Sequence, residues 1–227
     1  MCRIADKIRH ILDRIHEIEH AYGREDGAVT LLAVSKKQPA ERVRAAYDAG
    51  LRDFGENYLQ EAEEKITVLP LPGVRWHFIG PLQSNKTRRI AALFDWVHSI
   101  DRLKVATRLS EQRPAELPPL NVCIQINLAN EATKSGVDLA SAIALAEQID
   151  ALPRLQLRGL MTIPAPVQGL EQQRKQFRQL GDLFSTMRPR FRHFDTLSMG
   201  MSDDFEAAIA EGSTLVRIGT ALFGPRD

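Results

Sequence analysis

The chain has 227 residues, of which 44% are hydrophobic and 26% are charged, a composition typical of a globular protein with one sizeable core. The formal net charge of +1 gives no reason to expect a nucleic-acid or acidic-membrane partner. Two cysteines, Cys2 and Cys123, are too few for a disulfide framework or a metal cluster. The charged N-terminus lacks a signal-peptide core, and no stretch approaches the roughly 20 apolar residues of a membrane span. We therefore expect a cytoplasmic protein.

The first predicted element is an amphipathic helix over residues 2–21, where isoleucines recur at helical spacing with charges between them. After it, short β-rich runs alternate with amphipathic segments. The β-rich runs lie near residues 29–35, 52–54, 75–79, 95–99, 120–127, 156–161, 194–198 and 214–218. The segments between them include Pro39–Ala49, Asn57–Val68, Ser84–Leu93, Asp101–Gln112, Asp138–Ile149 and Leu170–Met187.

Eight strand–helix units in succession predict an α/β fold, a (β/α)8 TIM barrel with an extra N-terminal helix, formed by residues 1–227 as a single domain. The nearly continuous apolar run from Val29 to Val34 is typical of a strand covered on both faces. An open doubly wound sheet is the alternative fold.

The residue with the clearest chemical potential is Lys36, which follows this first apolar run. A lysine at the end of a strand buried on both sides is costly, because desolvation disfavours the ammonium. Such a lysine can lose its proton near neutral pH and attack a carbonyl group. The alternative is that its stem packs while its ammonium reaches solvent.

The other unusual residues also fall at predicted strand ends, which in a TIM barrel meet at the face that carries the chemistry. They are Asn57 after the second strand, His77 and Gly80 in and after the third, Asn127 after the fifth, Met161 and Thr162 at the end of the sixth, Ser198 to Ser202 after the seventh, and Arg217 to Thr220 at the eighth.

The last two of these loops resemble a phosphate cup. Gly200 and Gly219 would let backbone N–H groups approach an anion, and Ser198, Ser202 and Thr220 would add hydroxyls. As an alternative, Ser202 caps a helix that starts at Asp203, where Asp203 and Glu206 also fit a capping box.

Three further residues have both a structural and a functional interpretation. Arg217 lies within an apolar strand, so it is either the buried partner of an aspartate such as Asp195 or a donor to a ligand in the barrel mouth. His77 orients other groups by hydrogen bonds or satisfies the core, and His98 is interpreted in the same way. No second histidine or carboxylate stands at metal-ligand spacing.

Lys134, on a glycine-ended loop after the fifth strand, is either a solvated surface lysine or an anion contact at the barrel mouth. The chain contains no serine–histidine–acid triad, Walker loop or Rossmann glycine pattern.

Together these motifs resemble the pyridoxal phosphate homeostasis proteins, whose fold is like the N-terminal barrel of alanine racemase. The resemblance spans nearly the whole chain, in order. The matching segments are Ala33–Lys36, Phe54–Tyr58, the run HFIGPLQSNK from His77 to Lys86, Lys134–Gly136, Leu160–Thr162, Ser198–Ser202 and Arg217–Gly224.

The resemblance implies that Lys36 holds pyridoxal 5′-phosphate (PLP) as an internal aldimine and that Arg217 faces the pyridine nitrogen. It also implies that the phosphate is bound by Ser198, Ser202, Gly219 and Thr220. Asn57, His77 and Met199 would line the site, and Lys134 would influence cofactor exchange.

One departure from the family pattern concerns Gln38, where relatives often carry a second basic residue. Lys37 is one position early, which would turn its side chain in another direction on a strand exit. Any role as an auxiliary lysine is therefore in doubt.

The same residues bear on the reaction. Arg217 has donors only, so beside the pyridine nitrogen it would keep that nitrogen unprotonated and weaken the cofactor as an electron sink. The chain ends at Asp227, after the eighth strand, so we expect no second domain such as the one that supplies the opposing acid/base in alanine racemases.

Our first hypothesis is therefore a non-catalytic, monomeric PLP carrier that buffers the cofactor and delivers it to apo-enzymes by transient contact. The alternative is a single-domain PLP-dependent amino-acid racemase or lyase. A barrel enzyme acting on sugar phosphates ranks last, because it needs a carboxylate pair at the mouth and only Glu56 is a good candidate.

Overall fold

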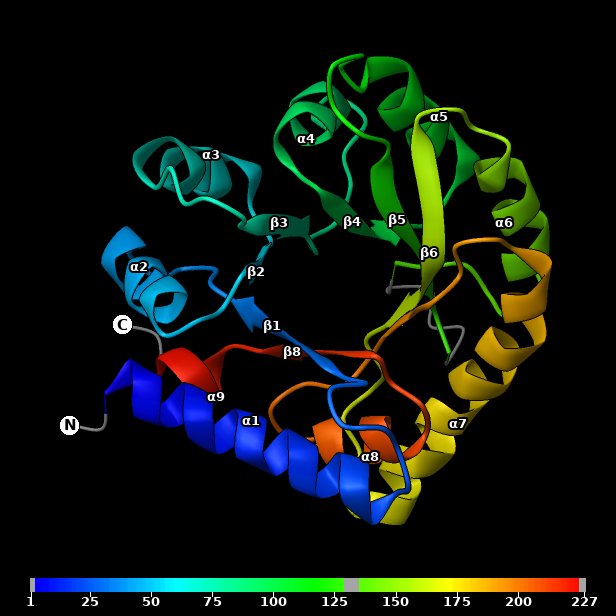
Figure 1. Ribbon diagram of the computed structural model, residues 1–227. Coiled ribbons are helices and arrows are strands. Elements are labelled where there is room, and N and C mark those ends of the chain that lie inside the picture. Colours follow the sequence, from blue (N-terminus) through cyan, green and yellow to red (C-terminus); the bar gives the residue numbers. More distant parts are fainter. Residues whose placement is uncertain (1–2, 129–134, 225–227) are drawn as a thin grey trace.

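The computed structural model describes residues 3–128 and 135–224, and it contains a closed barrel of parallel strands in the order β1 to β8 (Figure 1). This confirms the predicted TIM barrel and rules out the open sheet. The strands are β1 (Thr30–Val34), β2 (Asp53–Glu56), β3 (Arg75–Phe78), β4 (Trp96–Ile100), β5 (Leu120–Ile126), β6 (Leu155–Thr162), β7 (Thr196–Ser198) and β8 (Leu215–Ile218).

The helices surround the barrel, and most connect one strand to the next (Figure 1). They are α1 (Ile4–Ala21), α2 (Ala40–Asp48), α3 (Leu59–Val68), α4 (Thr87–Leu93), α5 (Leu103–Gln112), α6 (Ala142–Asp150), α7 (Leu170–Met187), α8 (Phe205–Ala210) and α9 (Thr220–Phe223). A 3₁₀ turn, η1 (Arg188–Arg190), follows α7.

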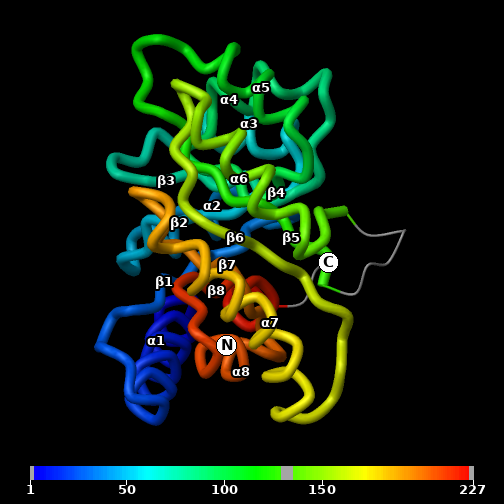
Figure 2. The backbone as a smooth tube through the Cα atoms, turned by 90° about the vertical axis from the view of Figure 1, so that its right-hand side faces the viewer, coloured from blue at the N-terminus to red at the C-terminus, as the bar shows by residue number. Residues whose placement is uncertain are grey.

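The extra helix α1 covers one side of the barrel, where it packs against α2, α8 and α9 (Figures 1 and 2). Its buried face contains four isoleucines, Ile8, Ile11, Ile15 and Ile18. Glu19, near its end, is fully buried, and its carboxylate accepts the backbone N–H groups of Gly27 and Val29 at 3.1 and 2.7 Å. The helix is therefore tied to the segment that leads into β1.

The main hydrophobic core fills the layer between strands and helices, as the alternation of strands and amphipathic helices requires. Two smaller buried clusters are separate from it, one formed by Leu32, Val34, Ile79 and Leu215 and the other by Trp96, Cys123 and Met161. Cys123 is buried in β5 as predicted, and burial raises the pKa of its thiol.

The strands also carry several polar side chains that are almost completely buried. His77, His98, Ser198 and Arg217 are each at most 4% exposed. Buried polar groups must find hydrogen-bond partners, and these groups find them largely in one another.

None of the described helices is long and apolar enough to cross a bilayer. Across residues 3–128 and 135–224, histidine, cysteine and acidic side chains form no group that could hold a metal ion.

Candidate functional site

A pocket of about 500 Å³ opens at the carboxyl ends of the strands, the end of a TIM barrel where active sites are built. Of the residues that the sequence singled out, six line it: Lys36, Asn57, Ser202, Arg217, Gly219 and Thr220. The other lining residues are Val34, Ile79, Ile163, Met201, Asp203 and Ala221. Ile163 was not anticipated, although it directly follows the predicted segment Leu160–Thr162, and Met201 lies within the predicted segment Ser198–Ser202 without having been given a role.

Lys36 lies at the exit of β1, partly buried, on the wall of this pocket. The preceding residue, Ser35, is fully buried. Its hydroxyl donates to Glu56 Oε1 at 2.6 Å, and its carbonyl accepts from Lys65 Nζ at 2.6 Å. The exit of β1 is therefore held by polar groups from β2 and α3.

Lys65 is the centre of that support, although sequence analysis did not single it out. This lysine of α3 is only 5% exposed, and its Nζ also donates to Glu56 Oε1 and Glu61 Oε1 at 2.7 and 2.6 Å. Burial raises the pKa of Glu56, and the opposing attraction of Lys65 is the largest influence that lowers it. The pair is thus a buried ion pair beneath the strand that carries Lys36.

Lys37 and Gln38 continue the chain away from the barrel. Lys37 is exposed and is the one non-glycine residue with positive φ, 59°, in the described part of the chain. Its backbone N–H donates to Glu61. Gln38 is buried and accepts from Arg42 at 2.9 Å. Lys37 is not among the residues that line the pocket, which agrees with the doubt about an auxiliary role.

Asn57 follows β2 and lines the pocket. Its Oδ1 atom is buried and has no hydrogen-bond partner within the protein. Leaving a buried acceptor unsatisfied costs about 1–3 kcal/mol. A ligand with a hydrogen-bond donor would remove that penalty.

Gly80 makes the close approach of β3 to Asn57 possible. A Cβ atom at this position would lie 2.1 Å from the Asn57 carbonyl oxygen. We expect Gly80→Ala to lower the free energy of unfolding by about 1–3 kcal/mol, because backbone atoms must move apart. Urea unfolding of the variant measures the loss. An unchanged denaturation midpoint would contradict the close contact.

Arg217 is buried, and its hydrogen bonds differ from those expected. Nη1 donates to the carbonyl and the hydroxyl of Ser198 at 2.7 and 2.8 Å, and Nη2 donates to the carbonyl of Thr162 at 2.7 Å. Asp195, the aspartate suggested in the ion-pair alternative, is instead paired with Arg158 at 2.6 Å, so that pairing was wrong. Burial lowers the pKa of Arg217 to about 10, and the guanidinium remains charged at neutral pH.

The loops after β7 and β8 carry the predicted hydroxyls and glycines. Gly200 has φ of +96°, and a Cβ there would lie 2.6 Å from the Ala208 side chain, so only glycine lets this loop pack on α8. Ser202 does not cap a helix. α8 begins at Phe205, and its N-cap residue Asp204 accepts the Met201 N–H at 2.6 Å. The capping interpretation of Ser202 was therefore wrong.

Three of the residues expected at the site do not line the pocket. Ser198 is fully buried between Arg217 and His98. Met199 is buried in the main core. His77 is bonded to His98 and to Asp53 at the opposite end of the barrel. The sequence placed all three near the site, but their side chains face the barrel interior or the outer core. Lys134 lies outside the described residues.

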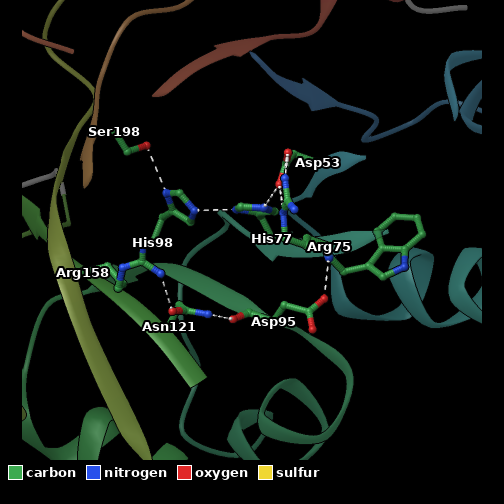
Figure 3. Close-up of polar contacts among 9 residues, drawn as sticks. Asp53, Arg75, His77, Asp95, His98, Asn121, Arg158 and Ser198 are labelled. Carbon is green, nitrogen blue, oxygen red and sulfur yellow. Dashed lines mark hydrogen bonds and ion pairs between the residues drawn. The ribbon is translucent and has the colours of Figure 1, made fainter. Parts of the chain in front are cut away.

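A second pocket, of about 490 Å³, lies at the amino ends of the strands. Its charged groups are paired with one another. Arg75 donates to both oxygens of Asp53 at 2.6 and 2.5 Å (Figure 3). Arg158 donates to both oxygens of Asp195 at 2.9 and 2.6 Å. We assign this end a structural role, because its charges are already satisfied.

We expect Asp53 to stabilise the fold in a pH-dependent way. Burial alone would raise the pKa of Asp53, but hydrogen bonds from His77 and Arg75 outweigh it and lower the pKa from 3.8 to about 2. The ionised carboxylate therefore stabilises the fold fully above about pH 4, and this contribution is lost as the pH falls toward about 2.

We expect the stability advantage of the wild type over Asp53→Asn to shrink by about 2 kcal/mol between about pH 5 and about pH 2. Urea unfolding across this range measures it. Asparagine cannot titrate, so a difference that stays constant with pH would contradict the low pKa.

Comparison with known proteins places this geometry in a family. The family described as alanine racemase, N-terminal domain, matches residues 7–227. The pyridoxal phosphate homeostasis protein of Escherichia coli K12 is 55% identical over 227 residues, covering 99% of this chain and 97% of the relative. The protein of the same name from Pseudomonas aeruginosa PAO1 is 58% identical, covering 100% and 97%. This chain belongs to the pyridoxal phosphate homeostasis protein family.

Solved structures agree with the family assignment. PipY of Synechococcus elongatus PCC7942, described with PLP bound, is 37% identical with a TM-score of 0.79, over 92% of this chain and 100% of that one. Alanine racemase from Corynebacterium glutamicum shares the fold at 17% identity and a TM-score of 0.70, over 98% of this chain and 61% of that one.

Proposed function

We propose that this family member binds PLP in the pocket at the carboxyl ends of the strands and acts as a carrier in PLP homeostasis. The observation that carries the proposal is the convergence of Lys36, Arg217 and the glycine- and hydroxyl-bearing loops on one pocket. Its volume of about 500 Å³ lies in the range of roughly 300–1,000 Å³ usual for small-molecule sites. The names of the relatives and the PLP-bound PipY structure support the same cofactor.

The polar residues that line the pocket have roles that their chemistry allows. Lys36 Nζ would attach covalently to the aldehyde carbon as a Schiff base, with loss of one water molecule. Ser202 and Thr220 would donate hydroxyl hydrogen bonds to the phosphate, beside the backbone of Gly219. The orphan Asn57 Oδ1 would accept a hydrogen bond from the ligand. The residues present therefore fit this cofactor.

Arg217 limits the chemistry of the bound cofactor to racemase-like reactions at most, or to its storage. Bound PLP supplies an electron sink, and its strength depends on protonation of the ring nitrogen. Arg217 uses both hydrogens of Nη1 and one hydrogen of Nη2 on Ser198 and Thr162. The remaining N–H groups of the guanidinium would donate to a ligand in the pocket that Arg217 lines. A donor there keeps the ring nitrogen unprotonated and the sink weak.

Borohydride reduction of the PLP-loaded protein tests the attachment. We expect a single reduced pyridoxyl group, which peptide mass mapping locates on Lys36. A label on another lysine, or no label at all, would overturn the proposed site.

The carrier and racemase alternatives differ in turnover. A carrier transfers PLP to an added apo-enzyme and gives no deuterium exchange at the α-carbon of an amino acid. A racemase or lyase gives exchange that disappears in Lys36→Ala. The monomeric state, the cytoplasmic location and the transient contact with apo-enzymes remain part of this proposal, and light scattering of the loaded protein tests the first.

A further inference from the structure

An unbroken line of hydrogen bonds crosses the barrel interior, from Arg217 at the pocket to Asp53 at the opposite end. Figure 3 shows its part from Ser198 to Asp53. Arg217 Nη1 lies 2.8 Å from Ser198 Oγ, which lies 3.0 Å from His98 Nδ1. His98 Nε2 lies 2.9 Å from His77 Nδ1, and His77 Nε2 lies 3.0 Å from Asp53 Oδ1. We call these five residues the interior chain.

The acid end of the interior chain fixes the direction of every bond in it. The pKa of Asp53 is about 2, so its ionised carboxylate can only accept, and His77 Nε2–H must donate to it. Burial lowers the pKa of His77 and lowers that of His98 well below the usual value. Both rings are therefore neutral at neutral pH, and each carries one N–H.

The remaining bonds follow from that first one. Because His77 Nε2 carries the proton, His77 Nδ1 is an acceptor and receives His98 Nε2–H. His98 Nδ1 is then also an acceptor and receives the Ser198 hydroxyl hydrogen. Ser198 Oγ is left to accept from Arg217, which has donors only.

Packing locks this arrangement in place. Arg75 holds Asp53 through both carboxylate oxygens, and the Trp96 ring stacks on His77 with centroids 5.3 Å apart and planes 9° apart. His98 and Ser198 are fully buried, so water cannot replace a lost partner without opening the barrel. Interior hydrogen bonds of this kind also polarise and strengthen one another.

We propose that Asp53, His77 and His98 are positioning residues, which act through Ser198 to hold the Arg217 guanidinium in the orientation that meets the ring nitrogen of the bound cofactor. The orientation of the interior chain concerns the protein alone, and its effect on the cofactor rests on the proposed function. The pocket is thus shaped from the far end of the barrel by groups that never touch the ligand.

The first test needs no cofactor. Two-bond ¹H–¹⁵N correlation spectra of the full-length protein at neutral pH report the tautomer of each histidine ring. We expect His77 and His98 to be neutral Nε2–H tautomers, assigned from His77→Gln and His98→Gln. We expect Asp53→Leu, which removes the terminal acceptor, to populate the Nδ1–H tautomer of both rings. A wild-type His98 in the Nδ1–H form would overturn the proposed direction.

The second test uses PLP labelled with ¹⁵N in the ring. His98→Leu breaks the interior chain, whereas His98→Gln can donate to His77 and accept from Ser198 in the same sense. We expect His98→Leu to weaken PLP binding about tenfold and to move the ring-nitrogen resonance toward that of free PLP. We expect His98→Gln to keep PLP affinity within about threefold of wild type and to keep the ring-nitrogen resonance at its wild-type position. Leu109→Met, a buried substitution in α5 of the main core, is the control and leaves the resonance unchanged.

The outcomes separate this inference from the proposed function. Absence of borohydride labelling at Lys36 removes the cofactor site but leaves the tautomer result standing. Normal labelling with an unchanged ring-nitrogen resonance in a folded His98→Leu would show that Arg217 needs no help from the interior chain. If His98→Leu fails to fold, the tautomers of the wild type and the binding of His98→Gln still decide.

Discussion

Lys36→Ala is expected to abolish covalent PLP binding, reducing the borohydride-stable label from about one group per chain to none. The amine is the nucleophile that condenses with the aldehyde, and alanine leaves the phosphate and ring contacts of the pocket in place. The visible absorption of the loaded protein should therefore revert to that of the free aldehyde. Absorbance spectra and mass spectrometry of the reduced protein measure both effects.

The neighbouring lysine provides a matched control. Lys37 is exposed, and it is not among the residues that line the pocket. Lys37→Ala should therefore keep the wild-type spectrum and full labelling. If Lys37→Ala lost the label while Lys36→Ala kept it, the assignment of the reactive amine would be reversed.

The barrel itself could be predicted because its signals are local and repeated. The apolar run near 29–35 became β1 at Thr30–Val34, and the helix expected over 170–187 is α7 with those bounds. The periodicity of apolar residues identifies each strand or helix from a short stretch of sequence. Eight strand–helix units in succession leave few possible sheet topologies. The predicted elements erred at their ends, such as α8, which begins at Phe205 rather than Asp203, and the short α9 and η1 were not predicted.

The pocket could be anticipated for a related reason. In a parallel barrel, residues that follow successive strands must meet at one face. Lys36, Asn57, Ser202 and Thr220 come from four separate strand exits and line one pocket. Predicting the fold and the pocket therefore required no knowledge of contacts between residues far apart in the sequence.

The hydrogen bonds of the interior chain could not be predicted from the sequence, because they join residues far apart in it. His98 and Ser198 are 100 positions apart, and no local pattern pairs them. Ser198 and Met199 are consecutive, yet one bonds inside the barrel and the other packs in the outer core. Strand alternation predicts that they face opposite sides, but it does not say which side each one takes.

Lys65 is the clearest case of a residue whose burial could not be predicted from the sequence. It lies in an amphipathic helix among glutamates, where a lysine is normally solvated. Only the approach of α3 to the ends of β1 and β2 places its Nζ against Ser35 and Glu56. Its removal is expected to have the largest effect on stability of any substitution considered.

Lys65→Met is expected to lower the free energy of unfolding by about 3–5 kcal/mol, because it leaves the carboxylate of Glu56 buried without its cation. Glu56 is fully buried, and its second oxygen, Oε2, already has no partner. Urea unfolding at neutral pH measures the loss. The same variant should loosen the exit of β1 and so slow the condensation of PLP with Lys36.

A second substitution separates the lost charge from the lost packing. Glu56→Gln removes the charge that Lys65 compensates, so the double variant Lys65→Met/Glu56→Gln should regain most of the stability that Lys65→Met loses. If the stability losses of Lys65→Met and Glu56→Gln simply added in the double variant, loss of the ion pair would not explain the effect of Lys65→Met.

The pH dependence of Lys65→Met follows from the same pair. Burial raises the pKa of Glu56, and Lys65 opposes that rise, so removing Lys65 raises the pKa further above its value of 4.5 in the unfolded chain. A carboxyl whose pKa is raised by folding destabilises the protein when ionised and is relieved by protonation. The deficit of Lys65→Met should therefore be largest at neutral and alkaline pH and shrink as the pH falls toward 4.5. A deficit that grew on acidification would mean that Lys65 acts by packing its stem and not by balancing the carboxylate beneath Lys36.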